Sequence, residues 1–113
     1  MSPRSYHARP GSGRCSPAEE YDFKVRDIAI DELVSAFKEK LGEMSALTEA
    51  NLKARIRMTV LYTLANRSDG IVLGTGNLSE WLLGYFTKYG DGAADMAPLI
   101  HLYKTEINII ASY

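Results

Sequence analysis

The fold is decided by the stretch Ile71-Val72-Leu73-Gly74-Thr75-Gly76-Asn77-Leu78-Ser79-Glu80. Its first three residues form a short, continuous apolar run, which is typical of a strand buried in a parallel sheet. The small residues that follow are typical of a turn, and a helix is expected from about Leu78 to Phe86. Ligands of open parallel sheets lie beyond the carboxyl ends of the strands. The turn at 74–77 is therefore the first candidate for a binding site.

One strand and two helices are expected before this stretch. In residues 23–30, apolar side chains first alternate on one side and an apolar run follows. This pattern is typical of a partly buried strand. Asp31 is the expected N-cap of a short amphipathic helix over 32–41. Thr48 is the expected cap of a longer helix that runs from 49 to about 67. Apolar residues recur there at four-residue steps: Leu52, Ile56, Val60 and Leu64.

A loop and a last helix are expected after it. Residues 89–98 contain glycine, aspartate and proline, which is loop chemistry, and residues 104–113 return to a helical pattern. The complete order is strand, helix, helix, strand, helix, loop, helix. This order predicts an α/β fold of three layers with a parallel sheet.

Length and composition narrow the class of protein. The 113 residues fit one domain, and 13 Lys and Arg against 14 Asp and Glu give a net charge of −1. Without a basic excess, binding to nucleic acid through phosphates is not expected. The most apolar run, 58–65, is far short of the roughly 20 residues of a membrane-spanning helix, so no membrane partner is expected. Cys15 is the only cysteine, which favours a reducing, cytoplasmic compartment.

The composition changes near residue 20. Residues 1–20 hold three of the four prolines and few large apolar side chains, so they cannot bury enough surface to order themselves. We interpret 1–20 as a disordered or non-native segment without a secretory signal. Residues 21–113 are expected to form one domain.

Three residues of the central region carry candidate chemistry. The Thr75 hydroxyl can bind a phosphate or a base, and Glu80 offers oxygen ligands to Mg²⁺. The alternative is an ordinary turn in which Glu80 suits the positive end of the helix. Arg55 suits bidentate recognition of a phosphate or carboxylate, although a solvated helix arginine is the commoner case.

Residues 84–95 mix aromatic, cationic, acidic and glycine residues, as binding loops often do. Lys88 can meet an anion and Asp91 can accept hydrogen bonds, but the two also fit a surface ion pair. Lys104 opens the last helix, where its ammonium and backbone N–H groups can hold an anion or remain solvated. Trp81, on the helix before this region, is expected to pack in the core.

Taken together, these segments resemble the ammonia-dependent NAD synthetases, a branch of the N-type ATP pyrophosphatases. The match rests on Asn51 to Met58, on Gly74-Thr75-Gly76-Asn77 through Glu80, and on Gly84-Tyr85-Phe86-Thr87-Lys88-Tyr89-Gly90-Asp91-Gly92. It continues through Ala94-Asp95, Pro98-Leu99 and Leu102-Tyr103-Lys104-Thr105. The resemblance implies an adenine nucleotide α-hydrolase-like domain with a parallel sheet, here incomplete.

The resemblance also implies a two-step ligase reaction. ATP adenylates the nicotinate carboxylate of deamido-NAD with release of pyrophosphate, and ammonia then displaces AMP to give NAD. Carried over by position, Glu80 would bind Mg²⁺, Thr75 and Lys104 would contact ATP, and Arg55, Lys88 and Asp91 would contact deamido-NAD. The family's members are homodimers, so a homodimer is expected.

The sequence lacks one motif of the family. The Ser-Gly-Gly-x-Asp-Ser loop, which in the family holds the triphosphate, does not occur among the 113 residues. The expected chain is therefore an internal fragment, inactive by itself and part of a longer parent. The alternative function is a non-catalytic module that binds deamido-NAD or mediates dimerisation.

Overall fold

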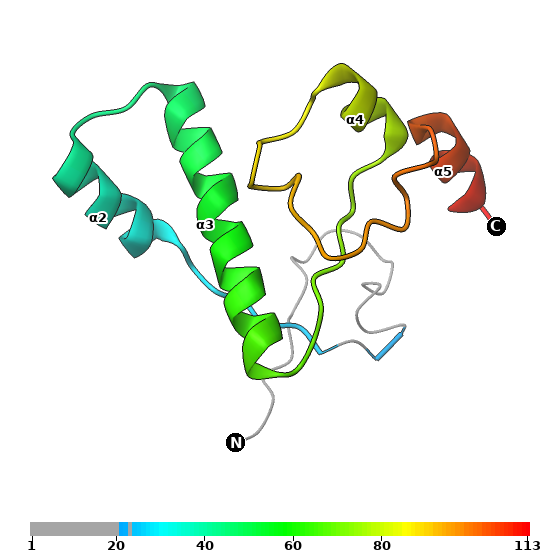
Figure 1. Cartoon of the computed structure of the whole chain (residues 1–113), viewed down its shortest axis with the longest axis horizontal. Coiled ribbons are helices and arrows are strands. Elements are labelled where there is room, and N and C mark those ends of the chain that lie inside the picture. Colours follow the sequence, from blue (N-terminus) through cyan, green and yellow to red (C-terminus); the bar gives the residue numbers. More distant parts are fainter. Residues whose placement is uncertain (1–20, 23) are drawn as a thin grey trace, which may run out of the picture.

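The structure, a computed structural model, describes residues 21, 22 and 24–113. The described residues form four helices: α2 (Asp31–Leu41), α3 (Ala46–Arg67), α4 (Leu78–Leu83) and α5 (Lys104–Ile110). Figure 1 shows α2 and α3 side by side and α4 and α5 together on the other side of the molecule. An extended connection after α3 joins the two helix pairs. The predicted segment 1–20 lies outside the described residues.

The two helices of the first pair are confirmed, but their predicted caps are wrong. Asp31 is already the first residue of α2, where its carboxylate suits the positive end of the helix, and Ile30 takes the N-cap position. Helix α3 is capped by Ser45, whose Oγ accepts a hydrogen bond of 3.2 Å from the Thr48 backbone N–H. The helix therefore begins about one turn earlier than Thr48 predicts, because Ser45 is an equally good capping residue.

An acidic residue joins α2 to α3. The Glu49 carboxylate lies 2.7 Å from Lys38 Nζ of α2 and 2.6 Å from Lys53 Nζ of its own helix. These two ammonium groups lower the pKa of Glu49 to about 2. Val34 of α2 and Ile56 of α3 are buried. The helix pair is thus joined by the Lys38–Glu49 ion pair, and each helix has one of these buried apolar side chains.

The predicted strands do not form in the part of the chain that the structure describes. Residues 24–30 have no regular structure, and 71–73 contribute a single parallel bridge, between Leu73 and Met96. Val72 is buried, but Ile71 and Leu73 are 61% and 58% exposed. A strand needs paired neighbours, and here one short segment supplies the only backbone pairing that 71–74 makes within the described residues. The parallel sheet remains a prediction.

Segment 94–97 holds 72–74 through the backbone. The Asp95 N–H donates to the Val72 carbonyl at 2.9 Å, and the Gly74 N–H donates to the Met96 carbonyl at 2.7 Å. Gly74 is required at this close approach, because a Cβ there would lie 2.7 Å from the Ala94 Cβ. The turn after Val72 is therefore fixed against the segment that precedes α5.

Helices α4 and α5 are shorter than predicted and meet near their first residues. Helix α4 ends at Leu83, because Gly84 adopts φ +66 and stops it. The Leu78 N–H donates to the Leu102 carbonyl at 2.9 Å, and the Lys104 N–H donates to Ser79 Oγ at 3.2 Å. These bonds fix α5 beside the start of α4. The predicted loop over 89–98 is confirmed.

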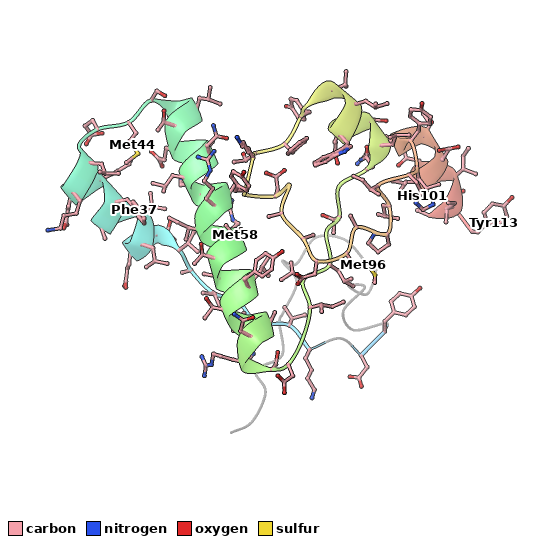
Figure 2. All side chains as sticks on the ribbon, in the orientation of Figure 1. Phe37, Met44, Met58, Met96, His101 and Tyr113 are labelled. Carbon is pink, nitrogen blue, oxygen red and sulfur yellow. The ribbon has the colours of Figure 1, made fainter. Side chains whose placement is uncertain are left out.

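Few apolar side chains are buried in the described part of the chain. The core consists of Val34, Ile56, Ala65 and Val72. Trp81 is 50% exposed, so the prediction that it packs in the core is wrong. Figure 2 shows many apolar side chains projecting from the ribbon, among them Tyr113 at the C-terminal end. Within the described residues, no helix is both long and apolar enough to cross a membrane.

Candidate functional site

A cavity of about 340 Å³ opens between α4, the start of α5 and the loop before it. The turn 74–77 forms one wall and residues 91–97 contribute another. The lining residues include polar, charged, aromatic and small side chains: Gly74, Thr75, Gly76, Asn77, Glu80, Trp81, Phe86, Asp91, Gly92, Ala94, Ala97, Ile100 and Lys104. Four of the six predicted site residues thus meet at one cavity.

The turn and the first turn of α4 are locked by a reciprocal pair of bonds. The Glu80 N–H donates to Asn77 Oδ1 at 3.1 Å, and the Asn77 N–H donates to Glu80 Oε2 at 3.0 Å. This capping box satisfies two backbone donors, and Asn77 is only 2% exposed. Glu80 therefore has a structural role at the helix start. Its carboxylate also lines the cavity, and one of its two oxygens remains outside the capping box.

The apolar wall of the cavity is a stacked aromatic pair. The rings of Trp81 and Phe86 lie 4.4 Å apart between centroids and are inclined by 21°. Gly92 is required beside them, because a Cβ there would lie 2.5 Å from Phe86 Cδ2. A planar aromatic surface next to charged groups suits a ligand that has a flat ring and an anionic part.

Asp91 and Lys88 do not form the surface ion pair that was the alternative for them. Asp91 Oδ1 accepts a hydrogen bond of 2.8 Å from the Thr87 N–H, and its side chain lines the cavity. The Lys88 ammonium instead lies 5.2 Å from the ring centroid of Tyr89. Within the described residues neither ion pair of the molecule involves Lys88.

Arg55 and Lys88 lie outside the cavity lining but next to each other. Arg55 Nε donates to the Lys88 carbonyl oxygen at 3.1 Å, so the exposed guanidinium of α3 is held against the loop. In the part of the chain that the structure describes, no carboxylate forms an ion pair with either cation. Cations without a carboxylate partner are suited to hold an anion.

Lys104 lines the cavity at the start of α5. Its backbone N–H is occupied by Ser79 Oγ. This N–H is therefore not available to an anion, and the predicted role of the Lys104 ammonium stays a prediction. The ammonium and the exposed Thr75 hydroxyl remain as the donors on their side of the cavity.

Asp95 is a residue whose structural role the sequence reasoning missed. Its Oδ2 accepts a hydrogen bond of 2.8 Å from the Val72 N–H, which adds a side-chain bond to the backbone pairing of this segment. Partial burial, together with the neighbouring Asp95 carboxylate, raises the pKa of Tyr62 on α3. The only sequence signal was its place in the Ala94-Asp95 block.

Comparison with known proteins gives one consistent answer. The family model for NAD synthase matches residues 15–113. The NH(3)-dependent NAD(+) synthetase of Archaeoglobus fulgidus is 51% identical over 96 residues, which cover 85% of this chain and 39% of that protein. Among solved structures, the NH3-dependent NAD synthetase of Campylobacter jejuni superposes with a TM-score of 0.81 at 36% identity, over 85% of this chain and 42% of that one.

A second solved structure widens the comparison. The NMN synthetase of Francisella tularensis has a TM-score of 0.80 at 37% identity, over 85% of this chain and 41% of that one. The fold is therefore one that NAD and NMN synthetases share. The chain belongs to the NAD synthase family. It spans about two fifths of the length of the Archaeoglobus relative that it matches.

Proposed function

We propose that this chain supplies the ATP-binding and deamido-NAD-binding residues of an ammonia-dependent NAD synthetase and works as part of a longer parent chain. The observation that carries the proposal is the single cavity that gathers Thr75, Glu80, Asp91 and Lys104 beside a stacked aromatic pair. These residues come from two helices and two loops, and a nucleotide needs their combination of donors, carboxylates and a flat apolar wall.

ATP is the ligand proposed for Thr75 and Lys104. Thr75 and Lys104 line the same cavity, and a Cβ at Gly76 would lie 3.9 Å from its nearest neighbour, so the backbone after Thr75 is open to close approach. An ammonium next to the triphosphate stabilises charge that develops on pyrophosphate as it leaves.

Mg²⁺ is the metal proposed for Glu80. Within the described residues no three His, Cys, Asp or Glu side chains gather as a metal cluster. Mg²⁺ nevertheless fits, because it keeps several waters and uses one or two carboxylates together with substrate phosphates. Glu80 has a carboxylate oxygen outside its capping box to serve in this way. When bound, the metal would neutralise charge on the phosphates.

Deamido-NAD is the ligand proposed for Arg55, Lys88 and Asp91. Arg55 and Lys88 offer two cations on segments that the bond from Arg55 Nε to the Lys88 carbonyl oxygen brings together, which suits a phosphate or the nicotinate carboxylate. Asp91 belongs to the same loop and lines the cavity. The loop thus connects the contact with Arg55 of α3 to the cavity.

In the proposed reaction the nicotinate carboxylate oxygen attacks the α-phosphorus of ATP and pyrophosphate leaves. Ammonia then attacks the acyl carbon, AMP leaves with the bonding electron pair, and a proton is lost from nitrogen. Arg55 and Lys88 orient the substrate, while Lys104 and Thr75 hold the phosphates. The proposed location is the cytoplasm, since the single cysteine fits a reducing compartment.

Isothermal titration calorimetry with ATP and with deamido-NAD tests this proposal. The chain should bind both nucleotides. Lys104→Ala should weaken ATP binding, whereas Lys40→Ala on α2, outside the cavity, should not. We expect no NAD formation from ATP, deamido-NAD and ammonia, because the chain contains no Ser-Gly-Gly-x-Asp-Ser block. Absence of binding to either nucleotide would contradict the proposal.

The second candidate function is a non-catalytic binding or dimerisation module. It is favoured by the many large apolar residues exposed in the described part of the chain, such as Leu83 at 81% and Leu82 at 66%. A homodimer is the proposed assembly. Light scattering should show association that Leu83→Ser reduces, and a monomer at high concentration would exclude it.

A further inference from the structure

Helix α3 holds the loop segment Thr87–Gly90 at three neighbouring points. Thr87 Oγ1 donates to Asn51 Oδ1 at 2.7 Å, and Arg55 Nε donates to the Lys88 carbonyl at 3.1 Å. Gly90 is buried between them, and a Cβ there would lie 2.9 Å from the Ala54 Cβ. Because Asn51 and Arg55 are four residues apart, they share one face of the helix. The loop therefore packs against that face of α3.

Thr87 is the centre of this arrangement. Its hydroxyl reaches Asn51, its N–H donates to Asp91 Oδ1 at 2.8 Å, and its carbonyl accepts from the Gly90 N–H at 2.9 Å. The loop is therefore tied to α3 at one end and to a cavity residue at the other. Displacing Thr87 would move Lys88 and Asp91 together.

We propose that Asn51 is a positioning residue, which acts through Thr87 to hold Lys88 and Asp91 in register with Arg55; this inference rests on the proposed binding of deamido-NAD. Asn51 itself does not line the cavity. Its bond to Thr87 is partly buried, so removing either partner leaves the other without its hydrogen bond. The resulting freedom of the loop lowers the fraction of molecules that present both cations correctly.

The experiment compares variants of the full 113-residue chain. Asn51→Ala and Thr87→Val each remove one partner, the double variant removes both, and Asn51→Asp keeps an acceptor oxygen. Asn66→Ala, on the same helix but far from the loop, is the matched control. Alanine is the best helix former, so Asn51→Ala does not weaken α3 itself, and circular dichroism checks this.

Two measurements separate positioning from ligand binding. Amide hydrogen exchange, followed by NMR, reports on Gly90 and Gly92, whose N–H groups donate to the Thr87 carbonyl, with Gly70 as the internal reference. We expect Asn51→Ala to speed exchange at Gly90 and Gly92 by about tenfold and to leave Gly70 unchanged. Calorimetry should show deamido-NAD affinity reduced by about tenfold.

The pattern across variants decides the proposal. The double variant should bind no more weakly than either single variant, and Asn51→Asp should recover most of the wild-type affinity and exchange. The role of Asn51 would be overturned if the losses of affinity in the two single variants added up in the double variant. Unchanged amide exchange at Gly90 and Gly92 would overturn it as well. If exchange changes as expected while the wild-type chain binds no deamido-NAD, the role of Asn51 in holding the loop is supported and the proposed ligand is wrong.

Discussion

Arg55 and Lys88 are 33 residues apart in sequence and are joined by a hydrogen bond of 3.1 Å from Arg55 Nε to the Lys88 carbonyl oxygen. The bond uses the backbone of Lys88 and one nitrogen of Arg55. Both positive charges therefore remain available to a ligand, and the bond holds the Arg55 guanidinium beside the backbone of Lys88.

Arg55→Ala should weaken the binding of deamido-NAD by roughly 10- to 100-fold, because a hydrogen bond to a charged group is lost. Arg55→Lys should recover little, since an ammonium cannot make the planar fork. Arg57→Ala is the control: Arg57 is an exposed arginine two positions along α3 and on another face. Calorimetry checks the affinities, and equal losses for both arginines would remove Arg55 from the site.

Gly92→Ala should separate the Trp81 and Phe86 rings, because the new methyl group would overlap Phe86. Trp81 is the only tryptophan, so its fluorescence maximum and the near-ultraviolet circular dichroism report the change directly. Gly70→Ala is the control, since a Cβ there meets its nearest atom at 3.4 Å. A tryptophan signal identical to that of the wild type would show that the stack does not depend on Gly92.

Acid should weaken the α2–α3 contact. The pKa of Glu49 is lowered from an ordinary 4.5 to about 2 by Lys38 and Lys53. A lowered pKa means that the stabilisation is present above pH 4.5 and is lost as pH falls toward 2. Urea unfolding at several pH values should show this loss in the wild type and not in Glu49→Gln. Glu39→Gln, an exposed position on α2, should keep the wild-type dependence.

Asp95→Asn should lower the pKa of Tyr62 part of the way toward 10. Partial burial is the larger cause of the raised pKa and is unchanged, whereas the repulsion between the Asp95 carboxylate and the phenolate is removed. NMR titration of ring-labelled tyrosine measures the shift. An unchanged Tyr62 titration would mean that the carboxylate does not act on this phenol.

Helices were the most predictable part of the fold. The four-residue apolar steps of α3 and the apolar spacing of α2 correctly predict their existence, whereas α4 ends at Leu83 and not at about Phe86 as predicted. These signals are local, so they can be read from neighbouring residues. Cap positions were less certain because Ser45 and Thr48 are both capable N-caps, and the structure selects the earlier one.

The candidate site was predictable only as separate pieces. The resemblance selected Thr75, Glu80, Asp91 and Lys104, and the structure brings them to one cavity. Asn51 and Asp95 carry no distinctive local pattern, because their partners Thr87 and Val72 lie 36 and 23 residues away. Such contacts depend on how distant segments pack.

By itself, the sequence determined the family, the helical segments and the residue types available for nucleotide chemistry, since ordered motifs and apolar periods are properties of the chain. Only the tertiary structure decided that Thr75, Glu80, Asp91 and Lys104 share a cavity, that Arg55 and Lys88 stand beside it as a pair, and that 71–73 makes one bridge with Met96 instead of a strand. The physical reason is that backbone pairing and side-chain convergence depend on partners distant in the chain, which local propensity does not encode.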